Sequence, residues 1–200
     1  MRKSIIKFIT LLLLILVLFP GCLVTSLHPL GGEEDIVFDE NLIGTWIDDD
    51  GDGWAFSKGE KNTYKLIIFD KENEVEFNAK LVKLGDKLFL DICPERLDTK
   101  SIYDILMLPT HTFMKFSLED SELSLGLNEP KWFNDRIEQN KDIGIQYTIS
   151  DDDIVILTAP TEELRAFYLK HADENDFFDF DKEKLHKSEN TFMIKEIKIH

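Results

Sequence analysis

Cysteine and histidine are scarce in this chain, and neither is clustered. The sequence holds two cysteines, Cys22 and Cys93, and five histidines, which are too scattered for the ligand spacing of a zinc site. The sequence also lacks G-x-S-x-G, H-E-x-x-H, G-x-x-x-x-G-K and the S-x-x-K motif with its partner motifs. These absences exclude the serine hydrolases, zinc proteases and P-loop proteins that such motifs identify.

Positive charge is also in short supply. The chain has 23 Lys and Arg against 39 Asp and Glu, a formal net charge of −16. This balance argues against nucleic acid as a partner, because the phosphates would repel the protein. It also argues against a domain that lies flat on an anionic leaflet. We therefore expect the folded domain to stand off the membrane. Its acidic surface could attract cationic partners or divalent ions.

Long hydrophobic runs are absent except at one place. The apolar run from Phe8 to Phe19 has twelve residues and follows the basic residues Arg2, Lys3 and Lys7. A bilayer-spanning helix needs about 20 residues, so the run suits the apolar region of a secretory signal. An uncleaved anchor and a buried helix of a soluble protein are the alternatives.

The end of this run resembles a known processing site. Phe19-Pro20-Gly21-Cys22 resembles the lipobox of bacterial lipoproteins, with Phe19 in a slot that usually holds Leu. The resemblance implies a diacylglycerol thioether on Cys22, cleavage before it, and acylation of the new amino group by a fatty acid such as palmitate. Removal of residues 1–21 takes away three positive charges, so the mature net charge would be −16 − 3 = −19. With Cys22 committed to lipid, Cys93 is expected to be a buried, inert thiol.

The rest of the chain has the pattern of short β-strands. Val75, Phe77, Ala79 and Leu81 alternate with polar residues, and similar runs recur at roughly 10–12-residue spacing. The prediction is a mainly β fold, an antiparallel meander that closes into a barrel-like or sandwich domain. Further strands are expected over 102–108 and 194–199.

Two helices are expected to pack on this meander. One starts after Asn128, and the other has Thr161 as its cap, followed by Glu162 and Glu163. The predicted organisation is a lipoprotein signal peptide over 1–21, an irregular lipidated tether over 22–36 and one β-rich domain over 37–200. Within that domain, residues 174–190 are expected to form an acidic loop whose phenylalanines touch the body.

The first predicted strand carries a second, short resemblance. Gly44-Thr45-Trp46 resembles the G-x-W signature of lipocalins and other calycins, in which the Trp closes the base of the barrel. An eight-stranded barrel is about wide enough for one small ligand or a filled core. Trp46, Trp54 and Phe77 are therefore candidates to line a ligand cavity, with simple core packing as the alternative.

An acidic turn follows this strand. Asp48, Asp50 and Asp52 occupy positions 1, 3 and 5 of an EF-hand loop and Gly53 occupies position 6, but position 12 is Gly59 rather than Glu. Flanking helices are also lacking, so a hairpin turn is the competing interpretation. Calcium at these aspartates is the one cofactor that the sequence raises.

A broader resemblance covers most of the mature chain. It rests on Ser26–Leu30, Val37–Asp39, Leu42–Trp46 and Leu157–Phe167, which together resemble a family of small uncharacterised bacterial lipoproteins. The resemblance implies one compact domain in the cell envelope and supplies no catalytic residues.

The sequence therefore predicts a membrane-anchored envelope lipoprotein, facing the periplasm or the exterior. It would act by binding another envelope protein or a small apolar ligand rather than as an enzyme. Two other functions stay open at this stage: an envelope hydrolase with an unrecognised acidic site, and a calcium-stabilised structural module.

Overall fold

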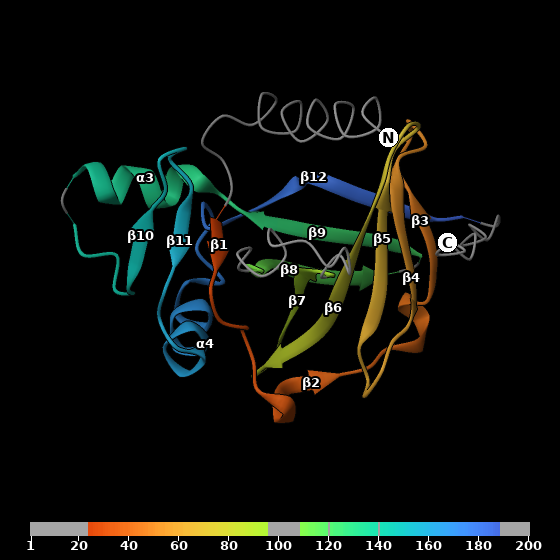
Figure 1. Cartoon of the computed structure of the whole chain (residues 1–200), viewed down its shortest axis with the longest axis horizontal. Helices are drawn as coiled ribbons and strands as arrows, with labels where there is room; N and C mark the ends of the chain where they lie inside the picture. Colours follow the sequence, from red (N-terminus) through yellow and green to blue (C-terminus); the bar gives the residue numbers. More distant parts are fainter. Residues whose placement is uncertain (1–23, 96–108, 120, 140, 189–200) are drawn as a thin grey trace, which may run out of the picture.

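The computed structural model describes residues 24–95, 109–119, 121–139 and 141–188. It shows a mostly β molecule in which a barrel carries a second layer on its outer face (Figure 1). The run from Phe8 to Phe19, Cys22, and the strands predicted over 102–108 and 194–199 lie outside the described residues.

The barrel has eight antiparallel strands. Seven of them follow one another along the chain as a meander, and the eighth pairs with both the last and the first of these seven. The predicted meander and its closure into a barrel are confirmed. The strands are β3 (Gly44–Ile47), β4 (Gly53–Lys58), β5 (Tyr64–Phe69), β6 (Glu74–Leu84), β7 (Lys87–Pro94), β8 (Thr112–Glu119), β9 (Glu122–Asn128) and β12 (Phe178–Lys187).

The closing strand β12 corrects one prediction. Residues 174–190 were expected to form an acidic loop, but most of this segment is β12. Its backbone pairs with β9 from Phe178↔Asn128 onward, with a register shift after Asp179, and with β3 at Lys187↔Trp46. The many charged residues of this segment suggested a loop, but a strand needs only one apolar face. The strands that pair with it are also far away in the sequence.

The second layer is inserted between β9 and β12. It contains the helices α3 (Pro130–Glu138) and α4 (Thr161–His171) and the hairpin of β10 (Tyr147–Ile149) and β11 (Val155–Leu157). Both predicted helices are confirmed. Thr161 is not the cap of α4, however, because its hydroxyl donates instead to the carbonyl of Pro29 at 2.9 Å.

The expected tether is also part of the fold. Residues 24–26 form β1 (Val24–Ser26), which pairs in parallel with β11 and completes a three-stranded sheet. Leu30 is fully buried, and a 3₁₀ turn (Glu33–Asp35) leads into β2 (Ile36–Val37), which pairs with β6. The described part of 22–36 is therefore ordered, because β1 pairs with β11 about 130 positions later in the chain and β2 pairs with β6 about 45 positions later.

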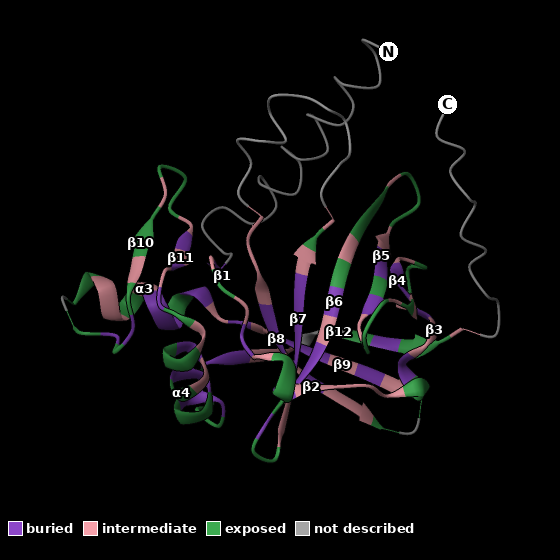
Figure 2. Cartoon of the chain, turned by 60° about the horizontal axis from the view of Figure 1, so that its bottom comes forward, coloured by how far each residue is buried: buried purple, intermediate pink, exposed green. Residues whose placement is uncertain are grey.

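Two hydrophobic cores result. Adjacent strand residues point to opposite faces, so Leu81, Leu90 and Met114 fill the barrel while their neighbours Val82, Phe89 and Phe113 face outward. We call the inner set the barrel core and the outer set, together with the residues of the second layer that cover it, the outer core. The buried stretches of β6 and β7 and the exposed end of the β10–β11 hairpin are visible in Figure 2.

Cys93 is half-buried at the end of β7 rather than fully buried as expected.

Candidate functional site

The three residues predicted to line a cavity lie in the packed barrel core. Trp46 is 1% exposed and stands opposite Trp54 on the neighbouring strand, and Phe77 packs against the same core. Around them, the interior is occupied by large side chains such as Tyr64 and Leu66. This geometry supports core packing for these residues.

Trp46 sits at the end of the barrel where β12 ends. Its indole Nε1 donates to the carbonyl of Leu42 at 2.8 Å, and the Lys187 ammonium lies 5.1 Å from its ring centroid. The same ammonium donates to the carbonyl of Asn41 at 2.8 Å. Gly44 has a φ of +132°, a backbone conformation that L side chains rarely adopt, so a larger residue at this position would be strained. Beside Trp46 is a depression of about 260 Å³.

The acidic loop after β3 is the connection of a hairpin. One carboxylate oxygen of Asp48 accepts from the backbone N–H groups of Asp50 and Asp52 at 2.9 and 3.0 Å. The Asp48 carboxylate is thus used within its own loop, as in an Asx turn. In the described part of the chain, no group of three or more His, Cys, Asp or Glu has the geometry of a metal site.

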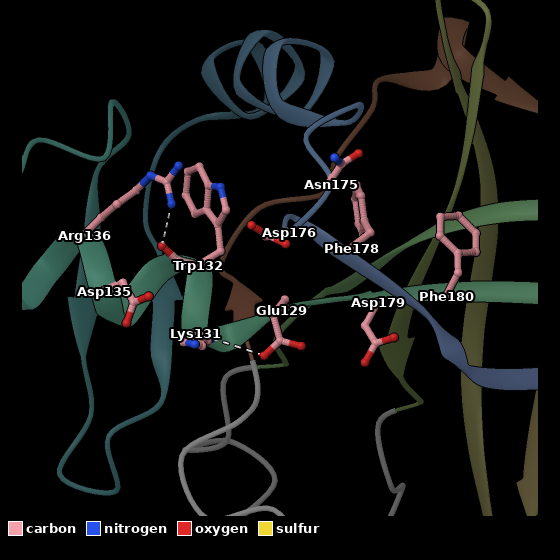
Figure 3. A pocket seen from close by; sticks show the side chains of 10 residues that line it. All are labelled: Glu129, Lys131, Trp132, Asp135, Arg136, Asn175, Asp176, Phe178, Asp179 and Phe180. Atoms are coloured by element: carbon pink, nitrogen blue, oxygen red, sulfur yellow. Dashed lines mark hydrogen bonds between the residues drawn. The ribbon is translucent and has the colours of Figure 1, made fainter.

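A cleft of about 630 Å³ opens between α3 and the start of β12 (Figure 3). Lys131 and Asp135 are exposed on the α3 side, and Asp176 is exposed on the other. Four carboxylates and two cations give the lining a net charge of −4 + 2 = −2. The lining residues are Glu129, Lys131, Trp132, Asp135, Arg136, Asn175, Asp176, Phe178, Asp179 and Phe180.

One wall of the cleft is held by Glu174, which follows α4. Its carboxylate accepts from Trp132 Nε1 at 2.8 Å, lies 2.6 Å from His171 Nδ1 and is 3.4 Å from Arg136 Nη2. Burial raises the pKa of Glu174, but the hydrogen bonds from Trp132 and His171 and the nearby positive charges outweigh it, so the net pKa is lowered. Glu174 therefore stays ionised and joins the end of α4 to α3.

Arg136 and Trp132 form the surface of this wall. The guanidinium carbon lies 3.6 Å from the Trp132 ring centroid, and Nη1 donates to the carbonyl of Trp132 at 3.1 Å. The stacking and the hydrogen bond together hold the guanidinium of Arg136 in place over the indole ring. Behind Trp132, the ring of His171 is buried among Phe167 and Phe177. The cleft is thus preorganised on its α3 side.

The sequence did not reveal this cluster. Glu174 lies 42 positions after Trp132, in a segment that was expected to be a loop. The neighbouring residues His171 and Asp173 have different partners. His171 contacts Glu174, and Asp173 forms ion pairs with Lys87 at 2.7 Å and Lys115 at 3.4 Å. Only the His171–Glu174 spacing of three was a usable local signal.

A hydrolytic carboxylate pair would be expected in a crevice with raised pKa values. Among the described acids, Glu76 is one whose pKa is raised, by burial first and then by Glu95 beside it. Glu76, however, is exposed on the outside of β6. This pair gives the hydrolase hypothesis no support.

No helix among the described residues has the length and apolarity needed to cross a membrane. Comparison of the chain with protein-family models, curated proteins and solved structures finds no match.

Proposed function

We propose that this protein is a lipid-anchored binding module of the bacterial envelope that takes a segment of a partner protein in the cleft between α3 and β12. The observation that carries this proposal is the contrast between the barrel interior and the cleft. The barrel interior is filled by side chains, whereas the cleft is open, of ligand size and walled by a preorganised cluster.

The lining of the cleft points to the chemistry of the partner. The net charge of −2 favours a Lys or Arg side chain over an acidic one. Phe178 and Phe180 offer an apolar surface to the methylene stem of such a side chain. The filled barrel leaves a small apolar ligand less room than the sequence suggested, so an envelope protein with a basic segment is the better candidate.

The envelope location and the anchor rest on the sequence. The basic head, the short apolar run and Gly21-Cys22 support export and acylation of Cys22. The contacts of Trp46 with Lys187 and Leu42 at one barrel end support a calycin-like relationship, since they suit a Trp that closes the barrel base.

Site-specific photo-crosslinking in the native host tests the cleft. A photoreactive side chain replaces Lys131 in the cleft or, as the matched control, Glu163, which is also exposed but lies on α4. We expect one discrete crosslinked envelope protein from position 131 and none from position 163. The adduct should disappear with Asp176→Lys, which reverses a cleft charge without touching the core.

Equal adducts from both positions, or an adduct from position 131 that survives Asp176→Lys, would contradict binding in the cleft. The anchor is tested separately by the intact mass of the protein from its native host. That mass should show acylation at Cys22 and loss of residues 1–21.

A further inference from the structure

The distance between the proposed lipid and the folded domain is very short. This inference rests on the proposed acylation of Cys22. β1 begins at Val24, two residues later. Two residues can span at most about 7 Å, so the acylated residue is held within that distance of the sheet.

The start of the fold is held too firmly to serve as extra tether. The backbones of Ser26 and His111 exchange two hydrogen bonds of 2.8 Å. The N–H of Leu30 donates to the Asp91 carboxylate at 3.0 Å, and His111 Nδ1 lies 2.7 Å from the other oxygen of that carboxylate. Peeling this segment away would expose Val24 and Leu30 and leave the buried Asp91 with fewer partners.

The strand pairing identifies what lies at this end of the sheet. β1 and β11 run parallel, with Val24 opposite Val155, so both begin at the same end. β10 is antiparallel to β11 and ends there, with Ile149 opposite Val155. The tip of the β10–β11 hairpin therefore lies at the same end of this sheet as the start of β1.

We propose that the domain sits directly on the phospholipid bilayer, with the tip of the β10–β11 hairpin facing the headgroups, rather than standing off the membrane as the net charge led us to expect. Ile149, at 45% exposure one of the most exposed large apolar residues described, supplies the apolar contact. The tip also carries Asp151, Asp152 and Asp153. These charges keep the contact at headgroup level and make the acyl chains, rather than electrostatic attraction, the force that holds the domain there.

Fluorescence quenching on the acylated full chain in phosphatidylcholine vesicles tests this orientation. In a Cys93→Ala background, an environment-sensitive fluorophore is attached through Asp152→Cys at the hairpin tip or, as control, Glu162→Cys. Glu162 is exposed at the start of α4, beyond the opposite end of β11. A quencher on the lipid headgroup should quench the label at position 152 several-fold more strongly than the label at position 162.

A third sample carries a flexible Gly-Ser insert between Leu23 and Val24. Because the fold and the acyl group are unchanged, the insert should reduce quenching at position 152 to the level of position 162. Equal quenching at both positions in an acylated sample without the insert, or quenching that the insert does not change, would overturn the inference and leave the anchor intact. A sample whose mass shows no acyl group would overturn the proposed anchoring itself.

Discussion

The barrel core and the outer core are held together in different ways. The barrel core comes mainly from strands that follow one another along the chain, and its buried members are almost all apolar. The outer core joins β1, an insertion between β9 and β12, and the outer face of the barrel. Most buried polar residues belong to this region: Thr25, Ser26, Asp35, Asp91, Asn128 and His171.

This difference has a physical cause. In a closed barrel every strand pairs with two neighbours, so the backbone N–H and C=O groups bond to one another within the sheet. The interior therefore needs no polar side chains. Among the described residues, the second layer is joined to the barrel by β-pairing only at the isolated bridge between Ser26 and His111. Buried hydrogen bonds such as that from Tyr168 to Asn128 at 2.7 Å therefore set its position. The barrel can be expected to persist without the layer more readily than the layer without the barrel.

The largest expected effect comes from opening a cavity in either core. Leu66 and Phe133 are both fully buried, in the barrel core and the outer core respectively. Leu66→Ala and Phe133→Ala should each cost about 3–4 kcal/mol in the free energy of unfolding, measured in urea. Hydrogen exchange should then separate them: Leu66→Ala exposes amides in both regions, whereas Phe133→Ala exposes those of α3, α4, β10 and β11 only.

Leu169→Ala is the control for this pair, because Leu169 is 41% exposed on α4 and its truncation should change both measurements little. Identical exchange patterns in the two core variants would show that the cores unfold as one unit.

A somewhat smaller effect is expected from the buried carboxylate that joins the layer to the barrel. Asp91→Ala leaves the N–H of Leu30 and the ring of His111 without their acceptor. A loss of about 3 kcal/mol should follow, together with faster exchange of the β1 amides. Asp86→Ala, at a side chain that is 89% exposed, is the matched control and should have little effect. Unchanged β1 protection in Asp91→Ala would mean that the strand pairing alone holds the segment.

The loss of folding stability at acidic pH should depend on Glu174. Its folded-state pKa lies below the ordinary value of 4.5, so its contribution is complete above that value and is lost as the pH falls through the folded-state pKa. Glu174→Gln should therefore lower stability at neutral pH and make the decline below pH 4.5 shallower. Thermal melts between neutral and acidic pH measure this. If the melting temperature of the variant falls with acidic pH just as that of the unmodified protein does, Glu174 does not contribute to the pH dependence of stability.

The smallest effect is expected at Glu76 on the outside of the barrel, with the opposite sign. Burial and the neighbouring Glu95 raise its folded-state pKa, so its ionised form costs stability above that pKa and the cost disappears as it is protonated at lower pH. Glu76→Gln should thus melt slightly higher at neutral pH, with the gain vanishing in acid. A lower melting temperature at neutral pH would reverse the sign assigned to this group.

Patterns confined to one short stretch predicted structure well. The alternation from Val75 to Leu81 indicated β6, and the acidic turn after Trp46 indicated the β3–β4 hairpin. Both succeed because the partner strand is the next one along the chain. β12 was missed because the pairing that orders its charged residues joins it to β9 and β3. The cleft was missed because it depends on Trp132 meeting Glu174 across two helices.

By itself, the sequence determined the fold class, the two helices and the acidic surface, because strand alternation, helix periodicity and net charge are properties of neighbouring residues or of composition. Only the tertiary structure decided that the barrel is filled, that the segment after Cys22 is a strand rather than a tether, and that a cleft opens between α3 and β12. These features depend on which distant segments meet, and that choice is made by the packing of the whole chain, which no local pattern records.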